Sequence, residues 1–138
     1  MKTTVKQLVF AAPVLFAILI ICNSFKPAQR NSIANGGGIA GDIHFNFNAV
    51  EQKDGSVIGH IQYDGVSYIV DCARWYNNYA ILFTTDGHAF YVADNGEGGS
   101  ATDYISDPIS GVECGDLISQ ADFGYPRHVS SGNIQVKN

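Results

Sequence analysis

Side chains that could bind a metal ion are concentrated between Asp94 and Asp103. Asp94, Asn95, Glu97 and Asp103 supply three carboxylates and one amide along a glycine-rich backbone. Hard oxygen ligands on a turning chain are what Ca²⁺ prefers, and extracellular modules often bind this ion weakly. The spacing differs from that of an EF-hand, and an Asx-type turn with a solvated Glu97 explains the same residues without a metal. The segment therefore predicts either a calcium site or a plain turn.

Aromatic residues near the expected turns form a second group. Trp75, Tyr76 and Tyr79 lie close together in the sequence, and Tyr125 follows much later. Exposed rings offer apolar platforms for sugar rings or for a partner surface. The alternative is that these rings plug one end of a barrel. The group therefore predicts binding to a cell-surface glycan or protein, or a structural plug.

Motifs of enzymatic chemistry are missing from the sequence. It contains no Gly-x-Ser-x-Gly, no His-Glu-x-x-His, no glycine-rich phosphate loop and no Cys-x-x-Cys. Asp94 with Glu97 or Asp103 could act as a carboxylate pair in glycoside cleavage, but a glycine-rich loop is a poor platform for the fixed separation required. His44 and His60 share one face, yet two imidazoles without a third ligand make a poor zinc site. We therefore expect a protein without catalysis.

Turn signals indicate how these residues are positioned. From Gly41 onward the chain alternates with period two, and Asp-Gly pairs at 54–55, 64–65 and 86–87 separate the alternating runs. Such pairs are the strongest short-range signal of a β-hairpin. A two-residue turn at 64–65 pairs Tyr63 with Val66, and a three-residue loop that ends with a left-handed Gly55 pairs Phe45 with Tyr63. The pattern thus predicts an antiparallel meander.

Register at the third turn follows the same argument. Across Asp86-Gly87, a two-residue turn pairs Phe83 with Phe90, which gives another apolar face. Arg74 would point inward if its strand continued without a break, so we expect a bulge near Ala73 to Trp75. The expected core is Ile43, Phe45, Phe47, Val57, Ile61, Tyr63, Val66, Tyr68, Val70, Ile81, Phe83, Phe90 and Val92.

The fold class that follows is all-β. We expect the meander to form a small β-sandwich or a partly closed β-barrel, and residues 132–136, which alternate again, to return and pair with the first strand. Residues 95–131 contain only short apolar pieces. Residues 41–138 therefore form a single β-domain.

The N-terminal region has the order of a secretory signal. Residues 1–24 carry Lys2 and Lys6, then an apolar run over 8–22, then small and polar residues. The run is shorter than the roughly 20 residues of a bilayer-spanning helix. We expect cleavage before Phe25 and no stable membrane span afterwards; retention as an anchor, or lipidation at Cys22, is the alternative. Residues 25–40 are expected to be a flexible, Gly-rich leader.

Removal of the signal also removes Cys22 and leaves Cys72 and Cys114. An even pair in an exported chain predicts a disulfide, whereas two buried thiols are the alternative. We therefore expect a secreted or extracytoplasmic location, at the cell surface or in the periplasm.

Charge excludes one class of partner. The formal net charge is −5, and it becomes more negative when Lys2 and Lys6 leave with the signal. Nucleic-acid binding draws on clustered Lys and Arg, which the chain lacks.

Short motifs in a fixed order cover nearly all of the predicted mature region. They are Gly36-Gly37-Gly38, Phe45-Asn46-Phe47-Asn48-Ala49, Asp54-Gly55, Gly59-His60-Ile61-Gln62-Tyr63, Cys72, Asn78-Tyr79-Ala80, Asp94-Asn95-Gly96-Glu97-Gly98, Asp103, Cys114 and Gly132-Asn133-Ile134-Gln135-Val136. Together they resemble a family of small exported bacterial β-domains, the post-choice-of-anchor-P (post-COAP) type. The resemblance implies an extracellular module without an assigned activity.

Three functions are therefore considered for the chain. The first is a non-catalytic module for binding or structural interaction. The second is a barrel that carries a small ligand in an apolar interior. Bulky aromatic residues pointing inward favour the first over the second. The third, less favoured, is a glycan hydrolase.

Overall fold

We describe the protein from a computed structural model, over residues 31–94 and 103–138. Residues 1–24, predicted to be the signal, lie outside this range, as do Asn95 and Glu97. Among the described residues, no helix is long and apolar enough to cross a membrane. The elements are β1 (Ile33–Ala40), β2 (Ile43–Glu51), β3 (Val57–Tyr63), β4 (Val66–Trp75), β5 (Tyr79–Thr84), β6 (His88–Ala93), β7 (Tyr104–Ile105), β8 (Ile109–Ser110), the 3₁₀ turn η2 (Gln120–Phe123) and β9 (Arg127–Lys137).

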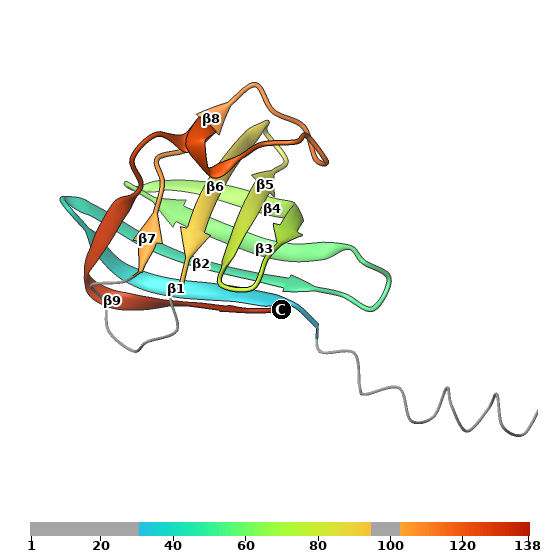
Figure 1. The fold of residues 1–138 in the computed structure, drawn as a ribbon, viewed down its shortest axis with the longest axis horizontal. Helices are drawn as coiled ribbons and strands as arrows, with labels where there is room; N and C mark the ends of the chain where they lie inside the picture. The colour runs from blue at the N-terminus through green and yellow to red at the C-terminus, as the bar shows by residue number, and fades with distance from the viewer. Residues whose placement is uncertain (1–30, 95–102) are drawn as a thin grey trace, which may run out of the picture. The chain divides into compact units, whose positions relative to one another are not determined.

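Hydrogen bonding closes these strands into a barrel. The order around the ring is β5-β4-β3-β2-β1-β9-β7-β6, and β6 pairs back to β5. All described pairings are antiparallel, and β8 is an extra strand on β6. Figure 1 shows β9 running beside β1. The all-β expectation is confirmed, and the barrel is closed, which leaves few exposed sheet edges.

The strand that closes the barrel was predicted to be flexible. Residues 33–40 were expected to belong to the leader, but they form β1, which pairs with β2 on one side and β9 on the other. The prediction was wrong because glycine at 36–38 reads as a tether when composition alone is considered. In the fold, the glycines allow close contact between strands: a Cβ on Gly38 would lie 1.9 Å from the carbonyl oxygen of Ser131, and one on Gly132 would lie 2.0 Å from that of Gly37. The returning strand also pairs with β1 instead of β2.

Two of the three predicted hairpin registers are confirmed. Phe45 pairs with Tyr63 across the first turn, and Tyr63 pairs with Val66 across the second. Gly55 has a positive φ of 87°, as the three-residue loop requires. Val66, which was expected in the core, is 50% exposed, because it sits at the start of β4 beside the turn.

The third register differs from the prediction by one residue. Phe83 pairs with Ala89 and Leu82 with Phe90, so Phe83 and Phe90 point to opposite faces of the sheet. The bulge in β4 falls between Val70 and Cys72, earlier than expected. The period-two argument failed here because β5 and β6 are buried on both faces, so an apolar residue at any position is compatible with either register.

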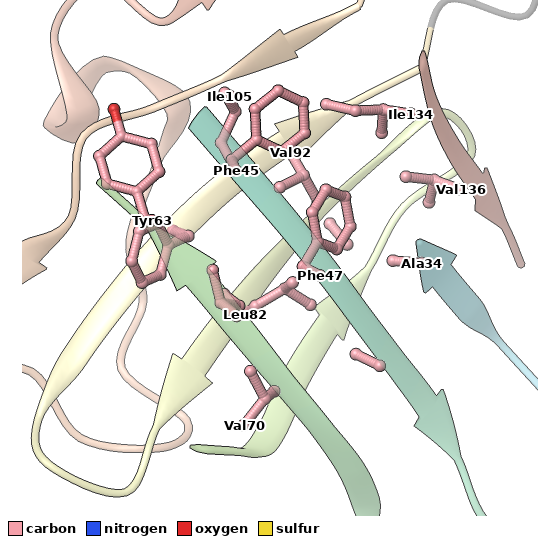
Figure 2. Packing of buried hydrophobic residues seen from close by; sticks show 14 of the residues in the cluster. Ala34, Phe45, Phe47, Tyr63, Val70, Leu82, Val92, Ile105, Ile134 and Val136 are labelled. Atoms are coloured by element: carbon pink, nitrogen blue, oxygen red, sulfur yellow. The ribbon is translucent and has the colours of Figure 1, made fainter. Parts of the chain in front are cut away.

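Side chains fill the barrel interior. In Figure 2, Phe45 and Phe47 from β2 point toward Leu82, Ile105 and Ile134 from the surrounding strands. Tyr63 packs edge-on against Phe90 with a centroid distance of 5.4 Å. Such interdigitated aromatic packing is typical of a small barrel with a solid core.

A second apolar cluster covers the outer face of β5 and β6. Its buried members are Ile81, Phe83, Ala89, Tyr91, Ala93 and Phe123. Phe123 comes from η2, so the segment between β8 and β9 folds over this face (Figure 1). We call the chain between β8 and β9 the covering segment. It brings Tyr125 close to tyrosine rings of β5, β6 and β7.

Candidate functional site

The disulfide between Cys72 and Cys114 positions the covering segment. The predicted bond is present, with a Cα–Cα distance of 5.7 Å. Two residues further along β4, Arg74 donates a hydrogen bond from Nη2 to the carbonyl oxygen of Gly115 at 2.6 Å. Both links tie β4 to the start of the segment that leads into η2 and β9.

An aromatic groove lies between this segment and the edge of β5, β6 and β7. This aromatic groove has a volume of about 540 Å³ and is lined by Asn78, Tyr79, Tyr91, Ala93, Tyr104, Gln120, Tyr125, Pro126 and His128. Four of these residues are tyrosines and one is a histidine. None of the described lining residues is Asp, Glu, Lys or Arg, so the groove suits an uncharged ligand.

The rings in the groove form an extended stack. Tyr79 stacks on Tyr76, with centroids 4.2 Å apart and planes within 9°. Tyr79 also contacts Tyr91, with centroids 5.3 Å apart. On the other wall, Tyr104 and His128 approach to a centroid distance of 4.3 Å. Mutual packing fixes these ring planes before any ligand arrives, which lowers the entropic cost of binding.

Exposure differs sharply among the tyrosines. Tyr91 is 5% exposed and forms the floor, whereas Tyr125 is 99% exposed at the rim. Burial, and then the neighbouring Tyr79 and Tyr104 hydroxyls, raise the pKa of Tyr91, so its phenol stays neutral at physiological pH. The groove thus combines a rigid apolar floor with one ring free to cover a ligand.

Sequence reasoning found part of this site. Tyr79 lines the groove and Tyr76 stacks behind it, as the predicted aromatic group required. Trp75 instead packs against the cluster in the barrel interior. Tyr91 and Tyr104 were missed because they belong to β6 and β7. The tyrosine hydroxyl within the apolar run of β6 was the available signal.

The acidic residues play a different part in the structure. Asp94 Oδ2 accepts a hydrogen bond from the backbone N–H of Val136 at 3.2 Å, and Asp103 Oδ2 accepts one from that of Ile134 at 2.8 Å. Both donors belong to β9, beyond the short stretch that pairs with β7. These two carboxylates therefore act as acceptors beyond the end of the ladder between β7 and β9.

Neither the calcium nor the hydrolase hypothesis gains support from this geometry. Asp103 is 4% exposed, and burial raises the pKa of its carboxyl. No group of three metal-ligating side chains occurs among residues 31–94 and 103–138. A carboxylate that is buried and held by a backbone N–H has little access to a glycosidic bond.

A Thr–Asp–His cluster lies at the β5–β6 turn. The hydroxyl of Thr84 donates to Asp86, and His88 Nδ1 lies 3.0 Å from the same carboxylate oxygen. In a nucleophilic triad the hydroxyl donates to the imidazole, and the carboxylate bonds only the histidine. Here both groups converge on Asp86, and the Thr84 hydroxyl also accepts from the His88 backbone N–H at 3.0 Å. The arrangement closes a turn.

One polar network connects β3 to β9. The buried Tyr63 hydroxyl donates to Asp107 Oδ1, which also accepts from Arg127 Nε at 2.9 Å. Arg127 Nη2 reaches the second oxygen at 3.3 Å. Hydrogen bonds from Arg127 and Tyr63 hold the pKa of Asp107 below its ordinary value.

Comparison of the chain with family models, curated proteins and solved structures finds no match. The resemblance to the post-COAP type therefore stays a prediction.

Proposed function

We propose that the chain is an extracytoplasmic, non-catalytic binding module whose aromatic groove takes an uncharged ring, such as one sugar residue of a cell-surface glycan. The fully exposed Tyr125 beside a preorganised wall of tyrosine rings is the observation that carries the proposal. Exposed aromatic side chains are costly to keep in water, and they are typical of binding surfaces.

The polar groups of the groove suit a hydroxylated ring. Asn78 and Gln120 place side-chain amides among the tyrosines, and amides both donate and accept hydrogen bonds. The apolar face of a sugar can stack on an aromatic ring while its hydroxyl groups reach such amides. Absence of charge among the described lining residues favours a neutral sugar over a uronic acid or a phosphate.

The proposed location follows from the disulfide and the leading segment. A disulfide persists in an oxidising compartment, which supports export. The net charge of −5 disfavours a nucleic-acid partner.

The carrier alternative has less support, because the barrel interior is occupied. Phe45, Phe47, Tyr63 and Phe90 pack against one another or against their neighbours inside it. A ligand there would have to displace packed side chains, each at a cost of about 1–3 kcal/mol.

Calorimetric titration with a panel of neutral mono- and oligosaccharides tests the proposal, with Tyr125→Ala as the decisive variant. We expect wild-type protein to bind at least one sugar and Tyr125→Ala to bind it about tenfold more weakly, which corresponds to roughly 1.4 kcal/mol. Leu117→Ala is the matched control, since Leu117 is 89% exposed on the same covering segment and does not line the groove.

Both variants should melt at the wild-type temperature, because each removes a side chain that buries little surface. Equal sugar affinity in Tyr125→Ala and wild type, or no binding by any sugar of the panel, would refute the proposal.

A further inference from the structure

A second surface lies across β9, β1, β2 and β3, and it carries amide side chains where the aromatic groove carries rings. Strand register aligns two rows of side chains across these strands. One row runs through Gln135, Asn35, Asn48 and His60 to Ile69 on β4, and the other through Asn133, Gly37, Asn46 and Gln62 to Ser67 on β4. We call the six amides of these rows, namely Asn35, Asn46, Asn48, Gln62, Asn133 and Gln135, the amide face.

The amide face points outward. Its residues alternate along each strand with buried ones, such as Phe45 and Phe47 on β2 and Ile134 on β9. Asn46, Asn48, Gln62, Asn133 and Gln135 are exposed, and Asn35 is half-buried. Neither of the two described rows contains a Lys, Arg, Asp or Glu.

Strand stability does not explain this choice of residues. Asn is depleted in β-strands, where β-branched and aromatic residues fit better. Yet four asparagines stand at outward positions of β1, β2 and β9. A solvated face is ordinarily kept soluble by charge, and this one has amides instead.

Gly37, which lies between Asn133 and Asn46 in the second row, is also unexplained by packing. A Cβ on Gly36 would lie 2.7 Å from the carbonyl oxygen of Asn133, and one on Gly59 would lie 2.4 Å from that of Asn48, so both positions require glycine. A Cβ on Gly37 would approach nothing closer than 3.5 Å, an ordinary contact. Glycine inside a strand weakens the strand, and it often marks a bulge, a tight bend, or a place where a ligand or another backbone approaches closely.

The bare backbone at Gly37 coincides with a hollow. A depression of about 610 Å³ is lined by Gly37 and Gly38 together with His44, Asn46, Gln62 and Ser131. Amide side chains at its edge are already aligned: Asn46 Nδ2 donates to Gln62 Oε1 at 3.0 Å, and Gln62 Nε2 donates to Ser67 Oγ at 3.5 Å. Each amide has four hydrogen-bonding positions, so these contacts leave donors and acceptors for a ligand.

We infer that the amide face binds a neutral, polyhydroxylated polymer, a glycan chain that lies across the strands and enters the hollow over Gly37. Hydroxyl groups both donate and accept, and so do amides, which makes the two complementary without any charge. The extent of the face, across four strands spaced about 4.8 Å apart, suits several linked sugar units better than one. The inference does not depend on the aromatic groove: β9 contributes to both surfaces, but no residue of the amide face lines the groove.

Native gels that contain a soluble polysaccharide test this inference. The probes are mixed-linkage β-glucan, xylan, galactomannan and amylose, with polygalacturonate and heparin as charged comparators. We expect at least one neutral polymer to retard the wild-type protein, and Gly37→Val to weaken that apparent affinity at least tenfold by filling the hollow. Ser110→Val is the matched control, because Ser110 is exposed on β8, away from the amide face.

Asn46→Thr provides a second test that keeps a good strand former, in case Gly37→Val unfolds. Tyr125→Ala should keep the retardation, which separates this surface from the aromatic groove. Retardation by none of the neutral polymers, or equal retardation of wild type and both face variants, would overturn the inference. So would concentration-dependent dimerisation of wild type that Gly37→Val abolishes, because the face would then bind a second copy of the chain.

Discussion

Removal of the Cys72–Cys114 disulfide should lower the free energy of unfolding by about 4 kcal/mol. The bond closes a loop with a sequence separation of 42 residues. In the chain-entropy model, the loss on opening such a loop is about 13 cal/mol/K, or roughly 4 kcal/mol at 25 °C. The unit from Asn31 to Asn138 has an expected unfolding entropy of about 230 cal/mol/K at the midpoint. The melting temperature should therefore fall by about 17 °C.

The double variant Cys72→Ser and Cys114→Ser, compared with wild type by urea denaturation and by thermal melting, measures this loss. Wild type under reducing conditions is the control, because it opens the same loop without new hydroxyl groups. Both should lose the same stability. A loss below about 1 kcal/mol in either would refute the reasoning, since packing of Phe123 and its neighbours would then constrain the covering segment without the bond.

Three further predictions concern stability. Asp107→Asn should flatten the acid limb of the stability curve: hydrogen bonds hold the pKa of the native carboxyl below its ordinary 3.8, so its contribution is present above about pH 4 and is lost as pH falls through the lowered pKa. Asp103→Asn should be more stable than wild type near pH 7 in urea titrations, because burial raises the pKa of Asp103, and stability is lost as pH rises through the raised value. Gly132→Ala should lower the free energy of unfolding by about 4 kcal/mol or more, because φ is 101° and the new Cβ would lie 2.0 Å from a carbonyl oxygen. Gly65→Ala should lower it by only about 1–2 kcal/mol, because φ is 79° but the space around the new Cβ is open.

The outcomes that would contradict these predictions are specific. An unchanged acid limb in Asp107→Asn would mean that its hydrogen bonds from Tyr63 and Arg127 do not persist in solution. Lower stability of Asp103→Asn at every pH would show that the charge itself is needed beyond the end of the ladder between β7 and β9. Equal costs for the two glycine variants would show that the close approach of β1 and β9 is relaxed.

How far the sequence predicts this fold depends on which faces of each strand are buried. The hairpins around Gly55 and Gly65 have one buried and one solvated face, so alternation fixed their register. In β5 and β6 both faces are buried, and alternation carried no information about whether Phe83 meets Phe90 or Ala89. Likewise, the role of β1 depends on contacts with β9, almost a hundred residues away, which local composition does not encode.

The sequence predicted only some residues of the candidate site. Tyr79 and Tyr125 were accessible to sequence reasoning because they lie near turns, where exposed rings are unusual. Tyr91 lies within a buried strand, and only the three-dimensional arrangement makes it the floor of the groove. Asp94 and Asp103 look like metal ligands in sequence, and in the structure they accept hydrogen bonds from the backbone of β9. The calcium site stays a prediction, because Asn95 and Glu97 lie outside the described residues.

Mapping of ligand contacts by NMR distinguishes the aromatic groove from the barrel interior as the binding site. During titration of ring-labelled protein with the sugar that binds in calorimetry, we expect shifts in the ring signals of Tyr79, Tyr104 and Tyr125 in the aromatic groove. The rings of Phe45 and Phe47 in the barrel interior should stay unchanged. Shifts confined to the interior rings would show that the ligand binds inside the barrel and not in the aromatic groove, as in a carrier.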